Sequence, residues 1–325
     1  MLRSGFGAKG AKSISSMQGG RSTSVDLAGG PDKIIRTLGG SDIKGWYDST
    51  DVRLASLAND ADLTFWYDKG PDETHLHQGT AANKPHYIHD GLNGHPVVRG
   101  DGSDDLYLTA DAGGSAKNID WGSSCSAFVL VKTADDNNNH GIFGGEGDDG
   151  SVPKSRFGFG SKQDQTDESD PDQLRVEVFG RVADGGSGET NFNIDNYYNM
   201  TGLITTCRNQ FALYYLEYKI NAGQAGLNAF TINAYDKPAT TPVSATLVGN
   251  FPNPLNVITT GEATTMEAKG FDTDRMQVFT NIHGSMGFLD GDLAFLLFSN
   301  RHYSSSEKEK ILKAIQQRFG NSNIN

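Results

Sequence analysis

Short runs of alternating apolar and polar residues, separated by turn residues, constrain this chain more than any other feature. In one run Leu174, Val176 and Val178 share a face and Arg175 and Glu177 share the opposite face, as in a half-buried strand. Similar apolar or alternating runs lie at residues 127–132, 156–160, 174–179, 211–220, 230–235, 275–280 and 287–299. The chain has 40 glycines in 325 residues, well above the average share of about 7%. This pattern predicts an all-β fold of many short antiparallel strands.

Turn residues with a preference for positive φ lie between several of these runs. Asn93-Gly94, Asp101-Gly102 and Asp290-Gly291 are the clearest pairs. Each supplies the backbone conformation that a tight hairpin needs. Asp290-Gly291 stands between two apolar segments, so we expect a hairpin there.

One helix is predicted near the end of the chain. Ser304 and Glu307 have the S-x-x-E spacing of a capping box. Gly320 is placed to cap the carboxyl end. Between them, four apolar residues form one stripe of a helix: Ile311, Leu312, Ile315 and Phe319.

The first 40 residues differ in composition from the rest. They are rich in Gly and Ser and lack apolar periodicity, so we expect a flexible arm. Six basic residues give it a net charge of +4 against two acidic ones: Arg3, Lys9, Lys12, Arg21, Lys33 and Arg36. The total charge of −12 then leaves −16 on the remainder. We expect the arm to anchor the chain on an acidic protein surface, with nucleic acid as the less favoured alternative.

The sequence also bears on the compartment. No stretch approaches the roughly 20 apolar residues of a membrane span, and the N-terminus lacks the apolar core of a secretory signal. We expect synthesis in a cytosol and no membrane contact. The two cysteines, Cys125 and Cys207, fit either two buried thiols, which we favour, or one disulfide.

Several motifs together resemble a known family. They are GWYD at 45–48, FWYDK at 65–69, KPHY at 84–87, GLNGHPVVR at 91–99, GSDD at 102–105, GDLA at 291–294 and RFG at 318–320. In this order they resemble the laminin-G-like, concanavalin-A-like jelly rolls of bacterial surface proteins and bacteriophage virion proteins, over about residues 41–320. One departure is Phe295, which stands where family members often carry a carboxylate.

The resemblance implies a two-sheet antiparallel jelly-roll sandwich over residues 41–325, preceded by the extended arm at 1–40 and ending in the one helix. It also implies a domain that binds glycans or serves as an assembly module. The motif residues themselves suit a scaffold, since Gly and Asn shape a turn and Val97-Val98 feeds a core.

Catalytic patterns are missing from the sequence. Related glucanases place two carboxylates on one strand as E-x-D-x-E or E-x-D-x-x-E, and neither pattern occurs. Glu146-Gly147-Asp148 begins such a pattern, but Gly150 and Ser151 follow. No G-x-S-x-G or P-loop motif is present. We therefore expect that the chain is not an enzyme.

Two sets of residues are candidates for binding. Calcium is the expected cofactor if there is one, because it prefers several oxygen ligands, and an acidic segment offers Asp135, Asp136, Asn137, Glu146, Asp148 and Asp149. Surface aromatic rings can stack on sugars, and the candidates here are Tyr197, Tyr198, Tyr214, Tyr215 and Tyr218. A solvated acidic loop and core tyrosines are the plainer alternatives.

These features favour a structural protein of a bacteriophage virion. We expect it on the particle exterior, as a capsid-decorating protein or head fibre, made in the host cytoplasm and anchored through residues 1–40 to other virion proteins of the capsid, neck or tail. We also expect a homo-oligomer. A carbohydrate-binding tail fibre or adhesin that recognises a host surface glycan is the first alternative, and a glycan-cleaving enzyme is the least favoured.

Overall fold

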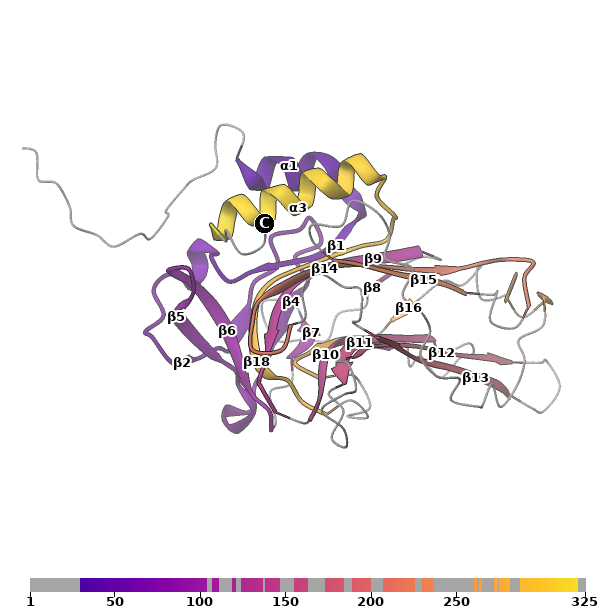
Figure 1. Cartoon of the computed structure of the whole chain (residues 1–325), viewed down its shortest axis with the longest axis horizontal. Helices are drawn as coiled ribbons and strands as arrows, with labels where there is room; N and C mark the ends of the chain where they lie inside the picture. Colours follow the sequence, from indigo (N-terminus) through magenta and orange to yellow (C-terminus); the bar gives the residue numbers. More distant parts are fainter. Residues whose placement is uncertain are drawn as a thin grey trace, which may run out of the picture.

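The computed structural model describes residues 30–103, 107–110, 119–120, 124–136, 138–146, 155–162, 173–183, 189–199, 207–225, 230–236, 260–261, 263–264, 272–273, 275–280 and 287–320. These residues form three layers, in which two helices lie over one sheet and a second sheet lies beneath it (Figure 1). The strand pairs are all antiparallel. The predicted all-β class and the two antiparallel sheets are therefore confirmed.

The sheet nearer the helices, sheet A, has eight strands. In spatial order seven of them are β15 (Phe230–Asp236), β14 (Ala212–Ile220), β9 (Ser124–Thr133), β18 (Asp290–Ser299), β6 (His95–Asp101), β5 (His86–Leu92) and β2 (Ala61–Asp62). The eighth strand, β1 (Ile43–Asp48), pairs with β18 off this path.

Sheet B also has eight strands. They run in the order β13 (Glu189–Asn199), β12 (Gln173–Ala183), β11 (Ser155–Lys162), β10 (Asn139–Glu146), β17 (Arg275–Val278), β7 (Tyr107–Ala110), β4 (His75–His77) and β3 (Phe65–Trp66). A small third sheet pairs β16 (Asp272–Thr273) with β8 (Ile119–Asp120). Short 3₁₀ turns lie at Gly40–Asp42, Val52–Leu54 and Ala81–Asn83.

Sheet A is buried on both faces, which explains the long apolar run in β18. Leu293, Leu296 and Phe298 face the core between the sheets, and Phe295 and Leu297 face the core under the helices. A strand covered on both sides needs apolar residues at successive positions. A register shift between Leu293 and Phe295 marks an irregularity in its pairing with β9.

The predicted terminal helix is α3 (Ser305–Phe319), and its ends follow the sequence signals. The Ser304 side chain accepts from the Glu307 N–H, and the Glu307 carboxylate accepts from the Ser304 N–H, which completes the capping box. Gly320 caps the other end with φ 56°. Ile311, Ile315 and Phe319 are buried against sheet A, and Leu312 is partly buried beside them.

A second helix, α1 (Pro31–Gly39), lies where the sequence predicted a flexible arm. Pro31 suits the first turn of a helix. Ile35 is fully buried, and Ile34 and Leu38 pack against the same core beneath α3. Residues 31–40 are therefore part of the folded body, and the predicted boundary at residue 40 is wrong. The exposed Lys33 and Arg36 are on this helix, whereas Arg3, Lys9, Lys12 and Arg21 lie outside the described residues.

Two of the three turn pairs, Asn93-Gly94 and Asp290-Gly291, had different outcomes. Asn93 and Gly94 join β5 to β6 with φ values of 51° and 79°, as a tight hairpin requires. Asp290-Gly291 instead begins β18, so the hairpin expected there is wrong. A Cβ on Gly291 would lie 2.1 Å from the Lys132 carbonyl oxygen. This glycine therefore permits the close approach of β9.

The two cysteines are both free and buried. Cys125 lies near the start of β9, and the Thr133 N–H near its end donates to the Cys207 carbonyl. Eight residues of a strand span about 26 Å, whereas a disulfide needs Cα atoms within about 7 Å. The alternative of a disulfide within one chain is therefore excluded.

A buried group of charges joins both helices to sheet A. Asp48 of β1 is fully buried, and its Oδ2 pairs with Lys69 at 3.1 Å and with Arg318 of α3 at 2.5 Å. Asp32 of α1 pairs with the same two cations. Three of the motifs that carried the family resemblance contribute Asp48, Lys69 and Arg318 to this group, which confirms their scaffold role. We call these four residues the Asp48 ion cluster.

Replacing Arg318 by alanine should destabilise the fold strongly. Asp48 would remain buried after losing one of its two cations, with Lys69 still paired to it, and breaking a buried ion pair on one side lowers stability by about 3–5 kcal/mol. Urea unfolding followed by tryptophan fluorescence measures the change. The control is Lys313→Ala, whose exposed pair with Glu309 is worth under about 1 kcal/mol. Equal losses in both variants would contradict this account of the cluster.

Candidate functional site

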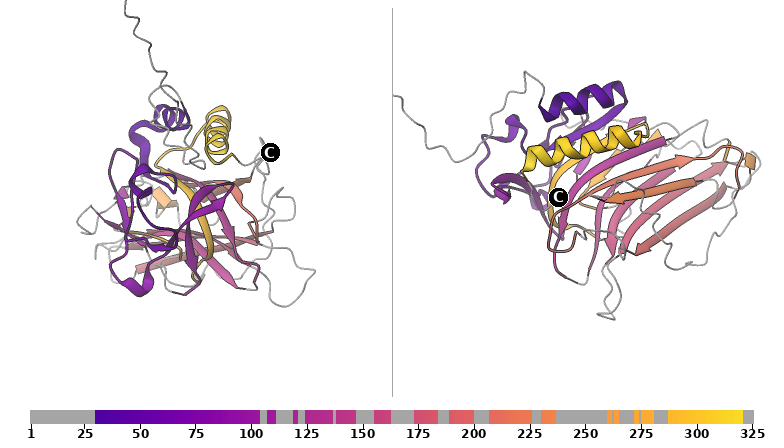
Figure 2. Two further views of the ribbon diagram at one scale, coloured as in Figure 1. Left: turned by 90° about the vertical axis from the view of Figure 1, so that its left-hand side faces the viewer. Right: turned by 45° about the horizontal axis from the view of Figure 1, so that its top comes forward.

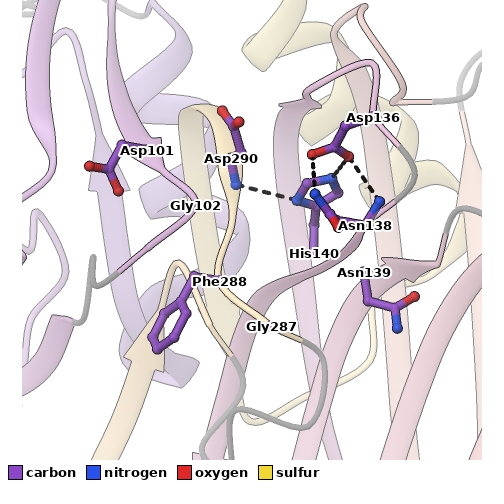
Figure 3. A pocket seen from close by; sticks show the side chains of 9 residues that line it. All are labelled: Asp101, Gly102, Asp136, Asn138, Asn139, His140, Gly287, Phe288 and Asp290. Carbon is purple, nitrogen blue, oxygen red and sulfur yellow. Dashed lines mark hydrogen bonds and ion pairs between the residues drawn. The ribbon is translucent and has the colours of Figure 1, made fainter.

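A polar pocket of about 480 Å³ opens among three segments at one end of the two sheets (Figure 3). One segment is the end of β6, the second is the turn between β9 and β10, and the third leads into β18. The pocket is lined by Asp101, Gly102, Asp136, Asn138, Asn139, His140, Gly287, Phe288 and Asp290. Its volume lies in the usual range for a small-molecule site.

Two glycines allow these segments to meet. Gly287 has φ 72°, and a Cβ there would lie 2.6 Å from the Asn139 carbonyl oxygen. Gly102 has φ 79°, and a Cβ there would lie 2.9 Å from the Cβ of Asp290. Both positions therefore require glycine for conformation and for space.

His140 connects the two sheets at the pocket wall. It belongs to β10 of sheet B, and its Nδ1 accepts from the Asp290 N–H of sheet A at 3.3 Å. Its Nε2 lies 2.8 Å from Asp136 Oδ1. Because Nδ1 is an acceptor, a neutral ring carries its proton on Nε2 and donates it to Asp136. His140 is 1% exposed, so this ring is a fixed part of the wall (Figure 3).

Asp136 is held as an ionised carboxylate. Its partial burial by itself raises its pKa, but hydrogen bonds from the Asn138 amide and backbone and from His140 outweigh that effect. The pKa of Asp136 therefore lies below its usual value. Asn138 Nδ2 donates to Asp136 Oδ2 at 2.7 Å, so the two side chains fix each other.

The lining suits a polyhydroxylated ligand. Carboxylate and amide groups bond sugar hydroxyls in both directions, and Phe288 supplies an apolar surface beside them. Asp101, Asp136 and Asp290 also make the pocket acidic, which disfavours anionic ligands. The pocket therefore fits a neutral or cationic polar molecule best.

The calcium candidates do not form one site in the described part of the chain. Asp135 pairs with Arg208 at 2.6 Å, and Asp136 is engaged by Asn138 and His140. Glu146 is at the far end of β10, seven residues from Asn139, which is about 23 Å along a strand. The predicted joint site of these three is wrong for that reason. No group of three or more His, Cys, Asp or Glu suited to a metal occurs among the residues described. Asn137, Asp148 and Asp149 lie outside them.

Three of the five tyrosine candidates are in the core. Tyr214, Tyr215 and Tyr218 are 0%, 0% and 1% exposed. Tyr218 donates to the Gly158 carbonyl across the sandwich, and Tyr215 donates to Glu217 at 2.8 Å. A buried ring cannot stack on a sugar, so these predictions are wrong. Tyr197 and Tyr198 lie in β13 opposite Arg175 and Leu174, and their role stays a prediction.

From the sequence, Asp101 and Asp290 are predicted as turn residues and Asp136 as a calcium ligand, and nothing in the sequence connects the three. His140 and Phe288 were missed altogether. They are about 150 positions apart, and no fixed spacing relates them. The run of Asp and Asn before His140 was the one local signal, since such runs mark a loop.

Among the described aspartates, Asp68 has the most clearly raised pKa. It lies outside the pocket, and its role is structural. Burial raises the pKa of Asp68 to about 6, although N–H groups of Gly70, Trp46 and Thr74 donate to it. Asp68 is 2% exposed, and both of its oxygens are engaged by these backbone donors. It fixes the loop between β3 and β4 against β1.

No family model matches the chain, and no curated protein matches it. Solved structures similar to it include a Trypanosoma rangeli sialidase in complex with sialic acid (10% identity, TM-score 0.43) and a GH54 arabinofuranosidase (9%, 0.48). A third is the binding domain of botulinum neurotoxin serotype D (8%, 0.38). Each match covers 87–88% of this chain. The chain covers 34%, 65% and 53% of the three proteins in that order, less than two thirds of each.

The expectation that the chain is not an enzyme is corrected by these comparisons. The similar structures include a sialidase and an arabinofuranosidase, so the exclusion of catalysis from missing sequence motifs does not stand. No reaction is assigned to this chain, because the identities are 8–10% and the TM-scores are below 0.5. The neighbours are β-rich proteins, compatible with a β-sandwich.

The raised pKa of Asp68 predicts a specific pH dependence. The folded-state pKa of about 6 exceeds the ordinary value of 3.8, so the stability that protonation gives is present at low pH and is lost as the pH rises through 6. The free energy of unfolding of the wild type, minus that of Asp68→Asn, should fall by about 2.4 kcal/mol between pH 4 and pH 7. Urea titrations at several pH values measure it. A constant difference would contradict the assignment.

Proposed function

We propose that this chain is a structural protein of a bacteriophage virion, displayed on the particle exterior as a capsid-decorating protein or head fibre. Its body is a concanavalin-A-like jelly roll, and residues 1–29 are the anchor to other virion proteins. It is made in the host cytoplasm and forms a homo-oligomer in the assembled particle.

The attachment of α1 to the body carries this proposal. An anchor holds a domain only if force on it reaches the domain. Asp32, three positions after residue 29, pairs with Lys69 and Arg318 within the Asp48 ion cluster. Arg36 on the next turn lies over the Trp46 ring at 5.1 Å. A pull on residues 1–29 is therefore transmitted to β1, to α3 and through them to both sheets.

The distribution of charge supports the same role. Residues 1–29 contain four basic groups and one acidic group, a net charge of +3. Because the net charge of the whole chain is −12, the remaining residues carry a net charge of −15. A positive segment on a negative body can dock on an acidic neighbour while the bodies repel one another and stay soluble. The family resemblance of residues 41–320 supports display on a virion.

Replacing residues 1–29 by a neutral Gly/Ser segment of equal length should abolish incorporation into particles. The core residues and the Asp48 ion cluster all lie within residues 30–320, so we expect the fold and its melting temperature not to change. Phage particles assembled in infected cells with either version are purified, and the chain is quantified by mass spectrometry and located by immunogold labelling. The matched control keeps the charge of the segment. In it, Arg3 and Arg21 are replaced by lysine, and Lys9 and Lys12 by arginine. Full incorporation of the neutral version would contradict the anchoring role.

Carbohydrate recognition by a tail fibre or adhesin is the second candidate, and the polar pocket favours it. The pocket combines carboxylates, amides and Phe288 in about 480 Å³. Its acidity points to neutral or amino sugars rather than acidic ones. A host surface glycan of that class would be the ligand.

A glycan array probed with the full chain, with calcium and again with chelator, tests this candidate. We expect a neutral or amino sugar to bind, and Asp290→Asn to weaken that binding about tenfold or more, as loss of a hydrogen bond to a charged group does. Asp135→Asn is the matched control, because it removes the same charge just outside the lining. The pocket assignment would be contradicted if no glycan on the array bound, or if both variants weakened glycan binding equally. Released reducing ends would show cleavage.

A further inference from the structure

The outward face of the helical layer is defined by exposed residues at helical spacing. The two helices lie side by side over sheet A (Figure 2), and their opposite faces are buried in the core beneath them. Apart from Ser305 and Ser306 in the first turn of α3, the exposed positions of the two helices are Lys33, Arg36 and Thr37 of α1 and Glu309, Lys310, Lys313 and Gln317 of α3. We call these seven residues the outer helical face.

This face is positive on a negative protein. Four of its residues are cationic and one, Glu309, is anionic and pairs with Lys313. Charges that point inward from the same helices are neutralised in the body, as Asp32 and Arg318 are in the Asp48 ion cluster and Lys308 is by Glu217. The two helices together carry a net charge of +3, so all other residues carry a net charge of −15.

We infer that the outer helical face is a docking surface for an acidic protein surface, which it contacts beside the anchor. This inference rests on the proposed anchoring function. It adds a second surface, the outer helical face, to the contact that residues 1–29 make with the partner. Residue 30 immediately precedes α1, so residues 1–29 enter the body at this layer. A partner that holds those residues therefore lies within reach of Lys33 and Lys310. Interaxial distances of packed helices are about 8–10 Å, so both helices can meet one partner.

The chemistry of the face favours an acidic protein over other polyanions. Binding to nucleic acid typically uses about 6–10 phosphate contacts, and the remaining charge of −15 repels a phosphate backbone. Membrane-binding helices expose large apolar side chains toward the lipid, and none of the seven residues of this face is apolar. The cations of this face are separated by polar residues and can pair with carboxylates on the surface of another protein. The affinity of such a contact falls as the salt concentration rises.

The test compares two double variants of the full chain, each of which changes the net charge by −4. Lys33→Glu with Lys310→Glu alters one cation on each helix of the outer face. Lys84→Glu with Lys219→Glu alters two lysines outside the helical layer, one before β5 and one in β14. Binding to poly-L-glutamate, which carries the carboxylates of an acidic protein surface, is measured at low and high salt. Double-stranded DNA and vesicles of phosphatidylserine and phosphatidylcholine are the other probes.

We expect the wild type to bind poly-L-glutamate at low salt. The helical double variant should bind at least tenfold more weakly, and the control double variant should remain within about threefold of the wild type. Lys33→Ala with Lys310→Ala, which leaves both helices neutral at these positions, should give an intermediate loss and serves if the glutamate variant fails to fold.

Four results would overturn the inference. They are no binding by the wild type, equal weakening by the helical and control variants, tighter binding to DNA or vesicles than to poly-L-glutamate, and sedimentation showing that this face joins two copies of the chain. Residues 1–29 are intact in all these variants. Failure here therefore differs from failure of the anchor, which is seen in the particles that carry the neutral segment.

Discussion

Asp48 is a carboxylate with no exposure to solvent, and it meets two cations from distant parts of the chain. An isolated charge in such a place would be strongly unfavourable, so Lys69 and Arg318 must be present for β1 to occupy its position. Asp32 then brings α1 to the same two cations. The helical layer, the sheet beneath it and the loop after β3 thus depend on one group of charges. Thr50 also donates to Asp48 through its backbone and its hydroxyl, which leaves few of the acceptor sites of this carboxylate unused.

The same arrangement makes sheet A an inner layer, and this has consequences at its end. β18 lies between β9 and β6 and also pairs with β1, and its side chains feed both cores. Its first residue, Asp290, leaves the core region and donates its N–H to His140 of the other sheet. The polar pocket lies where the hydrogen bond from the Asp290 backbone N–H to His140 joins the two sheets, in addition to the apolar packing between them. A rigid wall of this kind is what a specific binding site needs.

Charge divides the chain into two regions of opposite sign. The helical layer and residues 1–29 are positive, and the pocket with most of the sandwich is negative. A molecule with this distribution can attach to one neighbour through its positive side and present the pocket to a ligand. None of the helices described has enough apolar length to cross a membrane.

Local chemistry made part of this structure predictable from the sequence. Alternation predicted strands such as β12, β14 and β15, the Ser304–Glu307 capping box predicted α3, and Asn93-Gly94 predicted a hairpin, because each depends on residues a few positions apart. The sequence alone could not show which tyrosines face a core, since Tyr214 and Tyr215 point to opposite faces of a strand that is buried on both. It did not reveal α1 as a part of the body, because Ile35 needs α3 and β1 to cover it. The pocket and the Asp48 ion cluster join residues that are far apart in the chain, and only tertiary packing brings such groups within hydrogen-bonding distance.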